Sequence, residues 1–278
     1  MFNFLHTFLP QPILISFGPI TIHWYGLFIV SGILAAFYIM MSLADFYDID
    51  KNDIVDIGFW IVVFGIIGAR LYHVGLEWQY YVANPLNIIK IWNGGLAIHG
   101  AIIAGVITAY YLVKKYEIDF WKLAAIAAPG VAIGQAIGRW GNYFNQELYG
   151  LPTSLPWGIP IDTINKVPGY LDYAYFHPTF LYESIGNLLI FIVLISVHAW
   201  MIKKNKQEKS NFINVICLYL ILYSILRFCT EIIRIDYTPE MAGLRFPQIM
   251  SLILLIFAII LAVIYKKKSH PREGLKKL

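Results

Sequence analysis

A dense group of polar residues interrupts a strongly apolar sequence between Gly138 and Gly150. The stretch reads Gly-Arg-Trp-Gly-Asn-Tyr-Phe-Asn-Gln-Glu-Leu-Tyr-Gly and follows an apolar run at residues 123–137. Polar groups at membrane depth are costly because no water satisfies them, so they usually face a cavity or a substrate path. Glycine and asparagine also end helices, but a cap needs only one or two such residues. This stretch has eight, counting its glycines, asparagines, arginine, glutamine and glutamate. We therefore interpret it as the centre of a functional site.

A second polar group lies in a later apolar run, where Arg227, Glu231 and Arg234 follow at spacings of four and three residues. In a helix these spacings put the three side chains on one face. A structural ion pair between Arg227 and Glu231 would explain part of the pattern, and it does not exclude a functional role. One such pairing leaves a positive charge, and arginine matches phosphate oxygens with paired donors. An anion bound in an apolar bundle indicates a phospholipid head group.

Three further residues invite both a structural and a functional interpretation. His99 stands among glycines at residues 94–100. Such small neighbours leave room for another molecule beside the imidazole. A histidine in a membrane can also simply form a hydrogen bond to a neighbouring helix. Tyr25, in His-Trp-Tyr-Gly at residues 23–26, fits an interfacial aromatic belt on its own. Arg70 is a buried cation, and we expect another span to supply its partner because Glu77 is about two turns away.

Composition determines the class of protein. Of the 278 residues, 59% are hydrophobic and only 14% are charged, whereas a soluble domain carries about a quarter charged residues. The chain is therefore an integral membrane protein. Its net charge of +4 does not indicate a nucleic-acid partner, because the cations sit in short loops and the tail. Neither the two cysteines nor the histidines show the spacing of a metal site, so we expect no metal and no cofactor.

The elements that position these residues are predicted to be membrane-spanning helices. We expect an all-α bundle of about seven such helices, forming a single multi-pass domain over residues 1–278. The expected spans are residues 22–43, 54–76, 96–113, 123–139, 179–202, 212–233 and 248–265.

The distribution of lysine and arginine predicts the orientation. The connections after the first, third and fifth spans, together with the tail, carry most of the lysines. The positive-inside rule then places the N-terminus outside and the C-terminus in the cytoplasm. The longest connection, residues 141–178, would form an ordered, outward-facing cap, with the site toward the outer leaflet.

The polar motifs, taken in order, resemble the bacterial phosphatidylglycerol–prolipoprotein diacylglyceryl transferases. The resemblance covers nearly the whole chain. It rests on Gly138-Arg139-x-Gly141-Asn142-x-x-Asn145-x-Glu147-x-x-Gly150 together with five shorter motifs. These are His-Trp-Tyr-Gly at 23–26, Gly-Ala-Arg at 68–70, Gly-Gly-x-x-x-His-Gly at 94–100, His-Pro-x-x-x-Tyr-Glu at 177–183 and Arg-x-x-x-Glu-x-x-Arg at 227–234.

The resemblance implies a reaction at the membrane surface of a bacterium. The diacylglyceryl group of phosphatidylglycerol would move to the thiol of the lipobox cysteine of a preprolipoprotein, forming a thioether and releasing glycerol 1-phosphate. The nucleophile then belongs to the substrate, so the enzyme needs none of its own. The implied location is the cytoplasmic (inner) membrane, and the implied partners are phosphatidylglycerol, preprolipoproteins and the bilayer.

The resemblance also implies roles for individual residues. His99 would act as the base for the thiol, since a thiol must lose its proton to attack. Arg139 and Arg227 would stabilise the charge on the leaving phosphate. Tyr25 is implied as a further catalytic residue. The head group would be bound by Arg139 and Arg227 together with Asn142, Asn145, Glu147, Gly150, Glu231 and Arg234.

Two other classes of function compete with a transferase. In a transporter or channel for an anionic substrate, buried charges would line the ion path. An intramembrane hydrolase is less well supported because the sequence lacks a Gly-x-Ser-x-Gly turn or a metal motif.

Overall fold

A computed structural model describes residues 2–18 and 20–269, and nearly all of its long elements are helices. The fold class expected from the sequence, an all-α multi-pass membrane protein, is confirmed. Two groups of elements form separate units, Met1–Ile39 with Ala125–Leu278 (unit 1) and Met40–Ala124 (unit 2).

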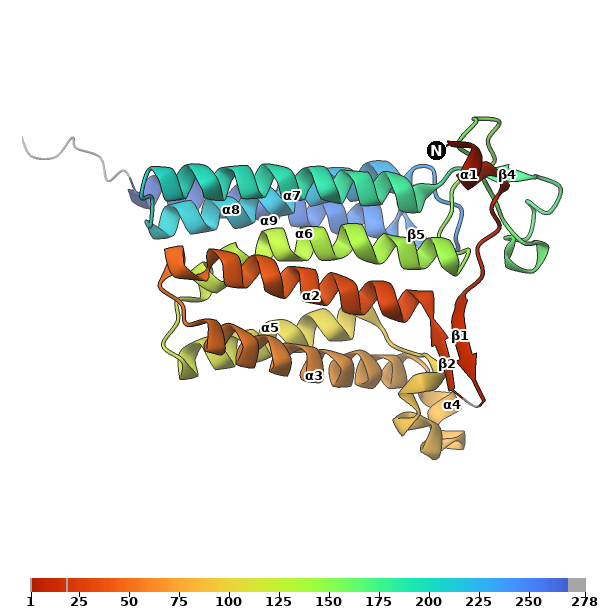
Figure 1. Cartoon of the computed structure of the whole chain (residues 1–278), viewed down its shortest axis with the longest axis horizontal. Helices are drawn as coiled ribbons and strands as arrows, with labels where there is room; N and C mark the ends of the chain where they lie inside the picture. Colours follow the sequence, from red (N-terminus) through yellow and green to blue (C-terminus); the bar gives the residue numbers. More distant parts are fainter. Residues whose placement is uncertain (1, 19, 270–278) are drawn as a thin grey trace, which may run out of the picture. The chain divides into compact units, whose positions relative to one another are not determined.

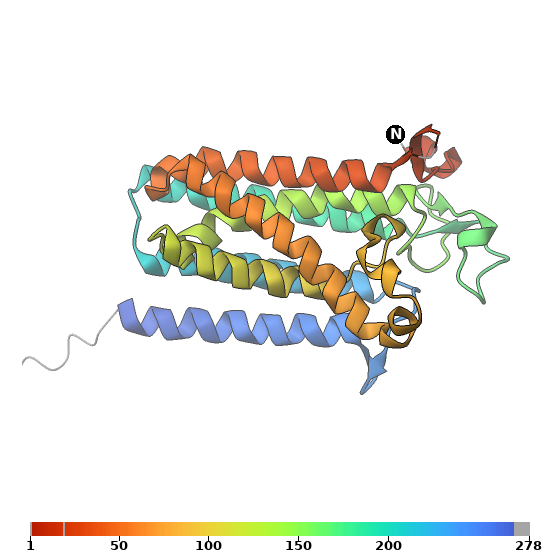
Figure 2. The same ribbon diagram turned by 90° about the horizontal axis from the view of Figure 1, so that it is seen from below.

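Unit 1 is built on five long helices. These are the first part of α2 (Trp24–Ala44), most of α6 (Phe120–Phe144), α7 (Thr179–Lys203), α8 (Lys209–Glu231) and α9 (Phe246–Ser269). Figures 1 and 2 show α7, α8 and α9 running alongside one another, with successive helices antiparallel. The C-terminal ends of α6 and α8 therefore lie at the same end of the unit as the beginnings of α7 and α9 (Figure 1).

Small residues allow α2 and α6 to pack closely in unit 1. A Cβ atom at Gly32 would lie 3.0 Å from the carbonyl oxygen of Gly134, and one at Gly130 would lie 3.1 Å from that of Ala36. In lipid, where no hydrophobic force drives helices together, such close backbone contact is a main source of association.

Short elements surround one end of unit 1. They are α1 (Phe2–Thr7), the antiparallel pairs β1 (Ile13–Phe17) with β2 (Ile20–His23), β3 (Ile159–Pro160) with β4 (Tyr175–Phe176) and β5 (Glu240–Met241) with β6 (Leu244–Arg245), and the 3₁₀ turn η4 (Thr163–Asn165).

The connection between α6 and α7 is ordered around a small aromatic core. Tyr143 stacks on Phe180, and Tyr149 packs on the fully buried Phe176. The amide of Gln146 fastens the N-terminal arm to this core, because its Nε2 donates to the Pro10 carbonyl at 2.8 Å.

Unit 2 is a pair of helices, α3 (Lys51–Leu76) and α5 (Ile98–Lys115). The two helices cross obliquely (Figure 2), and they touch where Gly68 meets Gly100. The shorter elements of the unit are η1 (Asp45–Tyr47), α4 (Trp78–Ala83), η2 (Pro85–Ile89) and η3 (Ile91–Asn93).

Six helices in the described part of the chain are long and apolar enough to cross a membrane. They match six of the seven expected spans. The remaining segment, predicted at 96–113, forms α5, whose 18 residues include His99 at the start and Lys114 and Lys115 at the end. These polar ends lower its mean hydropathy, and its length is only about 27 Å at ~1.5 Å per residue.

Candidate functional site

Most of the polar residues predicted from the sequence gather at one end of unit 1, whereas His99 and Arg70 belong to unit 2. Arg139 lies near the C-terminal end of α6, and Arg227 and Glu231 lie in the last turns of α8. Glu183 faces them from the second turn of α7. The antiparallel order of the helices brings these four side chains together, although they are far apart in sequence.

Glu183 contacts three arginines. Its Oε2 lies 2.5 Å from Nη2 of Arg139, and its Oε1 lies 3.3 Å from Nη1 of both Arg227 and Arg234. The carboxylate side chain is only 3% exposed. A buried carboxylate is costly unless it is paired, and here one carboxylate is shared by arginines from α6, α8 and the turn after α8.

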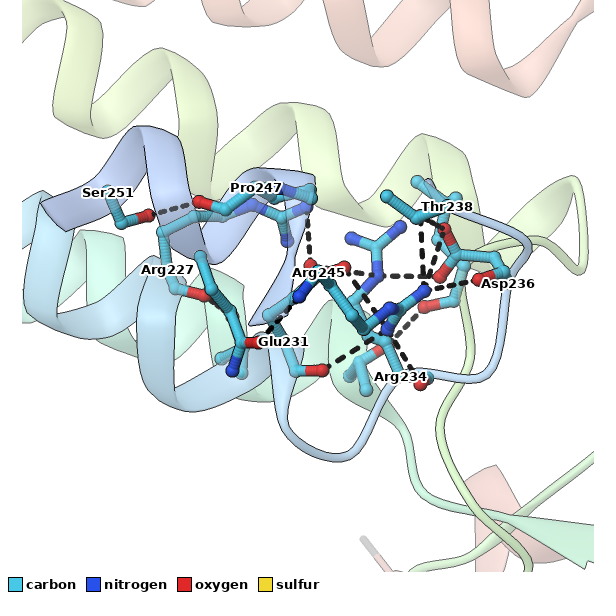
Figure 3. A network of polar contacts seen from close by, with 12 residues as sticks. Arg227, Glu231, Arg234, Asp236, Thr238, Arg245, Pro247 and Ser251 are labelled. Atoms are coloured by element: carbon cyan, nitrogen blue, oxygen red, sulfur yellow. Dashed lines mark hydrogen bonds and ion pairs between the residues drawn. The ribbon is translucent and has the colours of Figure 1, made fainter. Parts of the chain in front are cut away.

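Glu231 forms a second shared carboxylate within the same network, shown in Figure 3. Its Oε2 pairs with Nη2 of Arg227 at 2.7 Å and lies 3.7 Å from Nε of Arg234, while its Oε1 pairs with Nη1 of Arg245 at 3.1 Å. The ion pair between Arg227 and Glu231, considered from their spacing alone, is therefore present. Its side chains are 15% and 0% exposed.

Arg245 closes the turn between α8 and α9 (Figure 3). Its guanidinium donates to the carbonyls of Glu231 at 3.2 Å and Arg234 at 2.7 Å, and also to that of Asp236. Burial alone would raise the pKa of the Asp236 carboxyl, but its hydrogen bond to Arg234 and the charges of Arg234 and Arg245 hold that pKa below its ordinary value.

The polar stretch at the end of α6 extends the network toward the cap. Nη1 of Arg139 donates to Oδ1 of Asn142 at 3.2 Å, and Nδ2 of Asn142 donates to Oε1 of Glu147 at 2.7 Å. Asn145 reaches the same oxygen of Glu147 at 3.4 Å. The two asparagines therefore connect Arg139 to Glu147, as orienting residues would.

Within the described part of the chain, the arginines of the network outnumber the carboxylates that they contact. Arg139, Arg227, Arg234 and Arg245 form ion pairs with Glu183, Glu231 and Asp236, and Glu147 joins the network through Asn142. The arginines differ in access. Their side chains are 21% exposed for Arg139, 15% for Arg227, 14% for Arg245 and 4% for Arg234.

Gly150 has a packing role beside the network. It forms an isolated β-bridge with Arg234, and its N–H donates to the carbonyl of His177 at 3.0 Å. A Cβ atom at this position would lie 2.9 Å from the carbonyl oxygen of Ile233. The glycine thus allows the cap to approach the backbone that carries Arg234.

Tyr25 occupies the first turn of α2, also in unit 1, and packs on Gly141. A Cβ atom at Gly141 would lie 2.7 Å from Cδ2 of Tyr25. The tyrosine is 37% exposed. Gly141 in the polar stretch therefore makes the space in which the ring of Tyr25 lies.

His99 lies in unit 2, in the first turn of α5, where its side chain is exposed. Its ring centroid is 6.0 Å from that of Tyr72 on α3. The glycines around it were expected to leave room for another molecule, but two of them are used for packing. Gly100 meets Gly68, and Gly95 meets the guanidinium of Arg70.

Comparison with known proteins identifies the family. The family model of the prolipoprotein diacylglyceryl transferases matches residues 12–264. A phosphatidylglycerol–prolipoprotein diacylglyceryl transferase of Synechococcus elongatus is 41% identical over 264 residues, covering 94% of this chain and 90% of that protein. This chain belongs to the prolipoprotein diacylglyceryl transferase family.

Other members of the family are similar along most of their length. Proteins of the same name are 44% identical over 249 residues in Finegoldia magna, covering 90% of this chain and 93% of that protein, and 39% identical over 267 residues in Staphylococcus xylosus, covering 94% and 92%. The resemblance drawn from the motifs is thus confirmed, and the chain is a multi-pass membrane transferase. The transporter or channel alternative is not supported.

Three network residues had no assigned role in the predicted site: Glu183, which was noted only as the end of the motif at 177–183, and Asp236 and Arg245. The signal for Glu183 was available, since an ionisable residue inside an apolar helix indicates a functional site by default. Asp236 and Arg245 follow α8 in a short polar turn, where charged residues are common and give no comparable signal.

Proposed function

We propose that this transferase moves the diacylglyceryl group of phosphatidylglycerol to the sulfur of the lipobox cysteine of a preprolipoprotein. A carbon–sulfur bond forms at the glycerol carbon of the diacylglyceryl group. The bond from that carbon to the phosphate oxygen breaks, and glycerol 1-phosphate leaves with the electron pair. The thiol proton passes to a base on the enzyme.

The observation that carries the proposal is the pair of partly accessible arginines, Arg139 and Arg227. A guanidinium has five N–H donors. Among the described residues, Arg139 contacts Glu183 and Asn142, and Arg227 contacts Glu183 and Glu231, so each uses only some of its donors. The remaining donors suit the oxygens of a phosphodiester, whose negative charge grows as the leaving group departs. Preorganised donors in a poorly hydrated site stabilise such developing charge strongly.

The other residues of the network orient these two arginines. Glu183 and Glu231 hold the guanidinium of Arg227 from two sides, and Glu183 also holds that of Arg139. Arg234, whose side chain is 4% exposed, is buried and pairs with the carboxylate of Glu183. Asn142, Asn145 and Glu147 orient Arg139, while Gly150 and Tyr25 shape the surroundings of the head group.

His99 is proposed as the base that accepts the thiol proton. Imidazole is the side-chain base that changes charge near neutral pH, and the exposed position of His99 at the start of α5 leaves it open to a reactant. General-base catalysis of this kind contributes typically ~10²–10⁴-fold to a rate.

We propose that the protein resides in the bacterial cytoplasmic membrane, with its N-terminus outside, its C-terminus in the cytoplasm and its active site toward the outer leaflet. The lysine distribution supports this orientation. Reporter fusions within residues 150–172 test it, since cytoplasmic labelling of this segment would contradict the orientation.

The activity is tested with purified protein, phosphatidylglycerol and a lipobox peptide. Transfer predicts release of glycerol phosphate that requires the cysteine, together with a peptide whose mass increases by one diacylglyceryl group. The control peptide carries serine in place of the cysteine. Release without any peptide would indicate a hydrolase, and an absence of release would contradict the proposed reaction.

A further inference from the structure

Arg70 is a buried arginine in unit 2 whose partners are backbone carbonyls. The residue is 6% exposed. Its Nε donates to the carbonyl of Ile88 at 2.8 Å, and its Nη1 donates to those of Gly94 at 2.7 Å and Gly95 at 2.8 Å. Its Nη2 donates to the carbonyls of Asn87 and Lys90. We expected another span to supply the partner of Arg70, but its partners are backbone carbonyls of the loop at residues 87–95.

These contacts occupy the whole guanidinium. Arginine has five N–H donors and no acceptor, and the five acceptors are the carbonyls of residues 87, 88, 90, 94 and 95. The ring of Tyr81 covers the group from one side, with the Cζ of Arg70 5.1 Å from the ring centroid. No N–H donor of Arg70 remains for a substrate anion, so the role of Arg70 is to stabilise the loop.

The neighbours of Arg70 on α3 contact the segment that follows this loop. The carbonyl of Ala69 accepts from the N–H of Ala97 at 3.1 Å. At Gly68, the next residue back, the backbone lies against Gly100, where a Cβ atom would be 2.2 Å from the Gly68 carbonyl oxygen. Three consecutive residues, Gly68, Ala69 and Arg70, thus hold the backbone on both sides of His99.

We infer that Gly68, Ala69 and Arg70 form a clasp that positions His99, and that Arg70 is a positioning residue for the transfer reaction. The inference rests on the proposed base role of His99. A general base must lie within hydrogen-bond reach of the proton it takes, and a misplacement of about 1 Å can cost ~10²-fold in rate. Fixing the backbone just before and just after His99 limits such misplacement.

The test combines hydrogen exchange with a double-mutant cycle on the full-length protein. Arg70→Lys keeps the charge but cannot reach five carbonyls. We expect faster amide exchange in residues 87–97 and a fall in kcat of about 10- to 100-fold. KM for phosphatidylglycerol should stay unchanged, because the proposed phosphate ligands lie on α6 and α8. In a His99→Gln background, the same substitution should lower kcat by less than about twofold, since coupled residues are non-additive.

Two glycines supply a matched pair of variants that does not depend on removing Arg70. Gly94 and Gly95 both have positive φ, at +83° and +73°, so an alanine strains the backbone at either position. Only at Gly95 would the new Cβ atom meet Nη1 of Arg70, at 2.6 Å; at Gly94 it meets nothing within 4 Å. Gly95→Ala should therefore lower kcat more than Gly94→Ala. Lys115→Gln, at the far end of α5, should change neither exchange nor kcat.

The outcomes separate this inference from the proposed function. Unchanged exchange in residues 87–97 of Arg70→Lys would show that the clasp does not hold the loop. Faster exchange with losses that multiply in the double variant would show that Arg70 does not act through His99. A His99→Gln enzyme with wild-type rate would overturn the base assignment, and the positioning role with it, while the exchange data would still report on the loop.

Discussion

Arg139 and Glu183 join α6 to α7 through an ion pair in which Nη2 of the arginine lies 2.5 Å from Oε2 of the carboxylate. Arg139 is the most exposed arginine of the network, and Glu183 is almost completely buried. The buried carboxylate of Glu183 therefore holds the guanidinium of Arg139 in place, while other N–H groups of that guanidinium remain available to a ligand. This arrangement suits a phosphate that must be bound and then released.

Substitution of Arg139 should abolish transfer without preventing insertion. We expect Arg139→Ala to lose about 10²–10³-fold in kcat, the effect of removing one preorganised donor, and Arg139→Lys to recover little of it because a point charge cannot give paired hydrogen bonds. Glycerol phosphate release measures the rate. Lys203→Ala, at the opposite end of α7, is the control, and near-normal turnover of Arg139→Lys would refute paired recognition.

Loss of the Glu231 charge should destabilise the protein. Glu231 is fully buried and pairs with Arg227, Arg234 and Arg245, so Glu231→Gln leaves buried cations without their partner, at a cost of about 3–5 kcal/mol. Thermal unfolding in detergent measures the effect. The exposed pair of Asp45 and Lys51, at 3.0 Å, supplies the control, because Asp45→Asn should cost less than about 1 kcal/mol. Equal effects of the two substitutions would contradict a structural role for Glu231.

Gly150→Ala should distort the junction between the cap and the turn after α8. The added Cβ atom would lie 2.9 Å from both the Ile233 carbonyl oxygen and Cβ of His177. Overpacking of this kind costs typically ~1–3 kcal/mol, and the unfolding midpoint should fall accordingly. At Gly75 in α3 a Cβ atom meets nothing within 4 Å, so Gly75→Ala should be neutral or slightly stabilising. A Gly150→Ala protein as stable as the parent would show that the junction can relax.

The turn after α8 should weaken in acid. Because the pKa of Asp236 is lower in the folded protein than in the unfolded chain, its stabilising effect is complete above the ordinary aspartate pKa of about 3.9. That effect is lost as the pH falls through the lower, folded value. Unfolding midpoints measured from neutral pH downward should therefore fall less steeply for Asp236→Asn. Asp48→Asn, at an exposed aspartate, should keep the parent slope, and identical slopes for all three proteins would refute the linkage.

His99→Gln should lower the rate by about 10²–10⁴-fold, the usual contribution of a general base. The parent enzyme should not need prior ionisation of the substrate thiol, because His99 takes the thiol proton during attack. In the variant, the remaining activity should rise toward alkaline pH as the substrate thiol, with an ordinary pKa of ~8.5, ionises unaided. Transfer rates of the parent and the variant, measured from acid to alkaline pH, test this role of His99. A parent-like rate and profile in the variant would leave thiol activation to the arginines.

The sequence alone determined the class of protein, six of the helices that cross the membrane, the family and the polar stretches that carry the site. These properties follow from composition and from local periodicity, which the order of residues contains directly. Arg227 and Glu231 illustrate this, because a spacing of four within one helix predicts their ion pair without any knowledge of the fold.

The tertiary structure decided which groups meet across helices. Glu183 of α7 meets Arg139 of α6 and Arg227 of α8 only because the three helices pack in a particular register, and no spacing in the sequence contains that register. Arg70 shows a second limit. Its partners are carbonyl groups, which every residue possesses, so residue types could not reveal them. Both kinds of contact therefore emerged only from the packed structure.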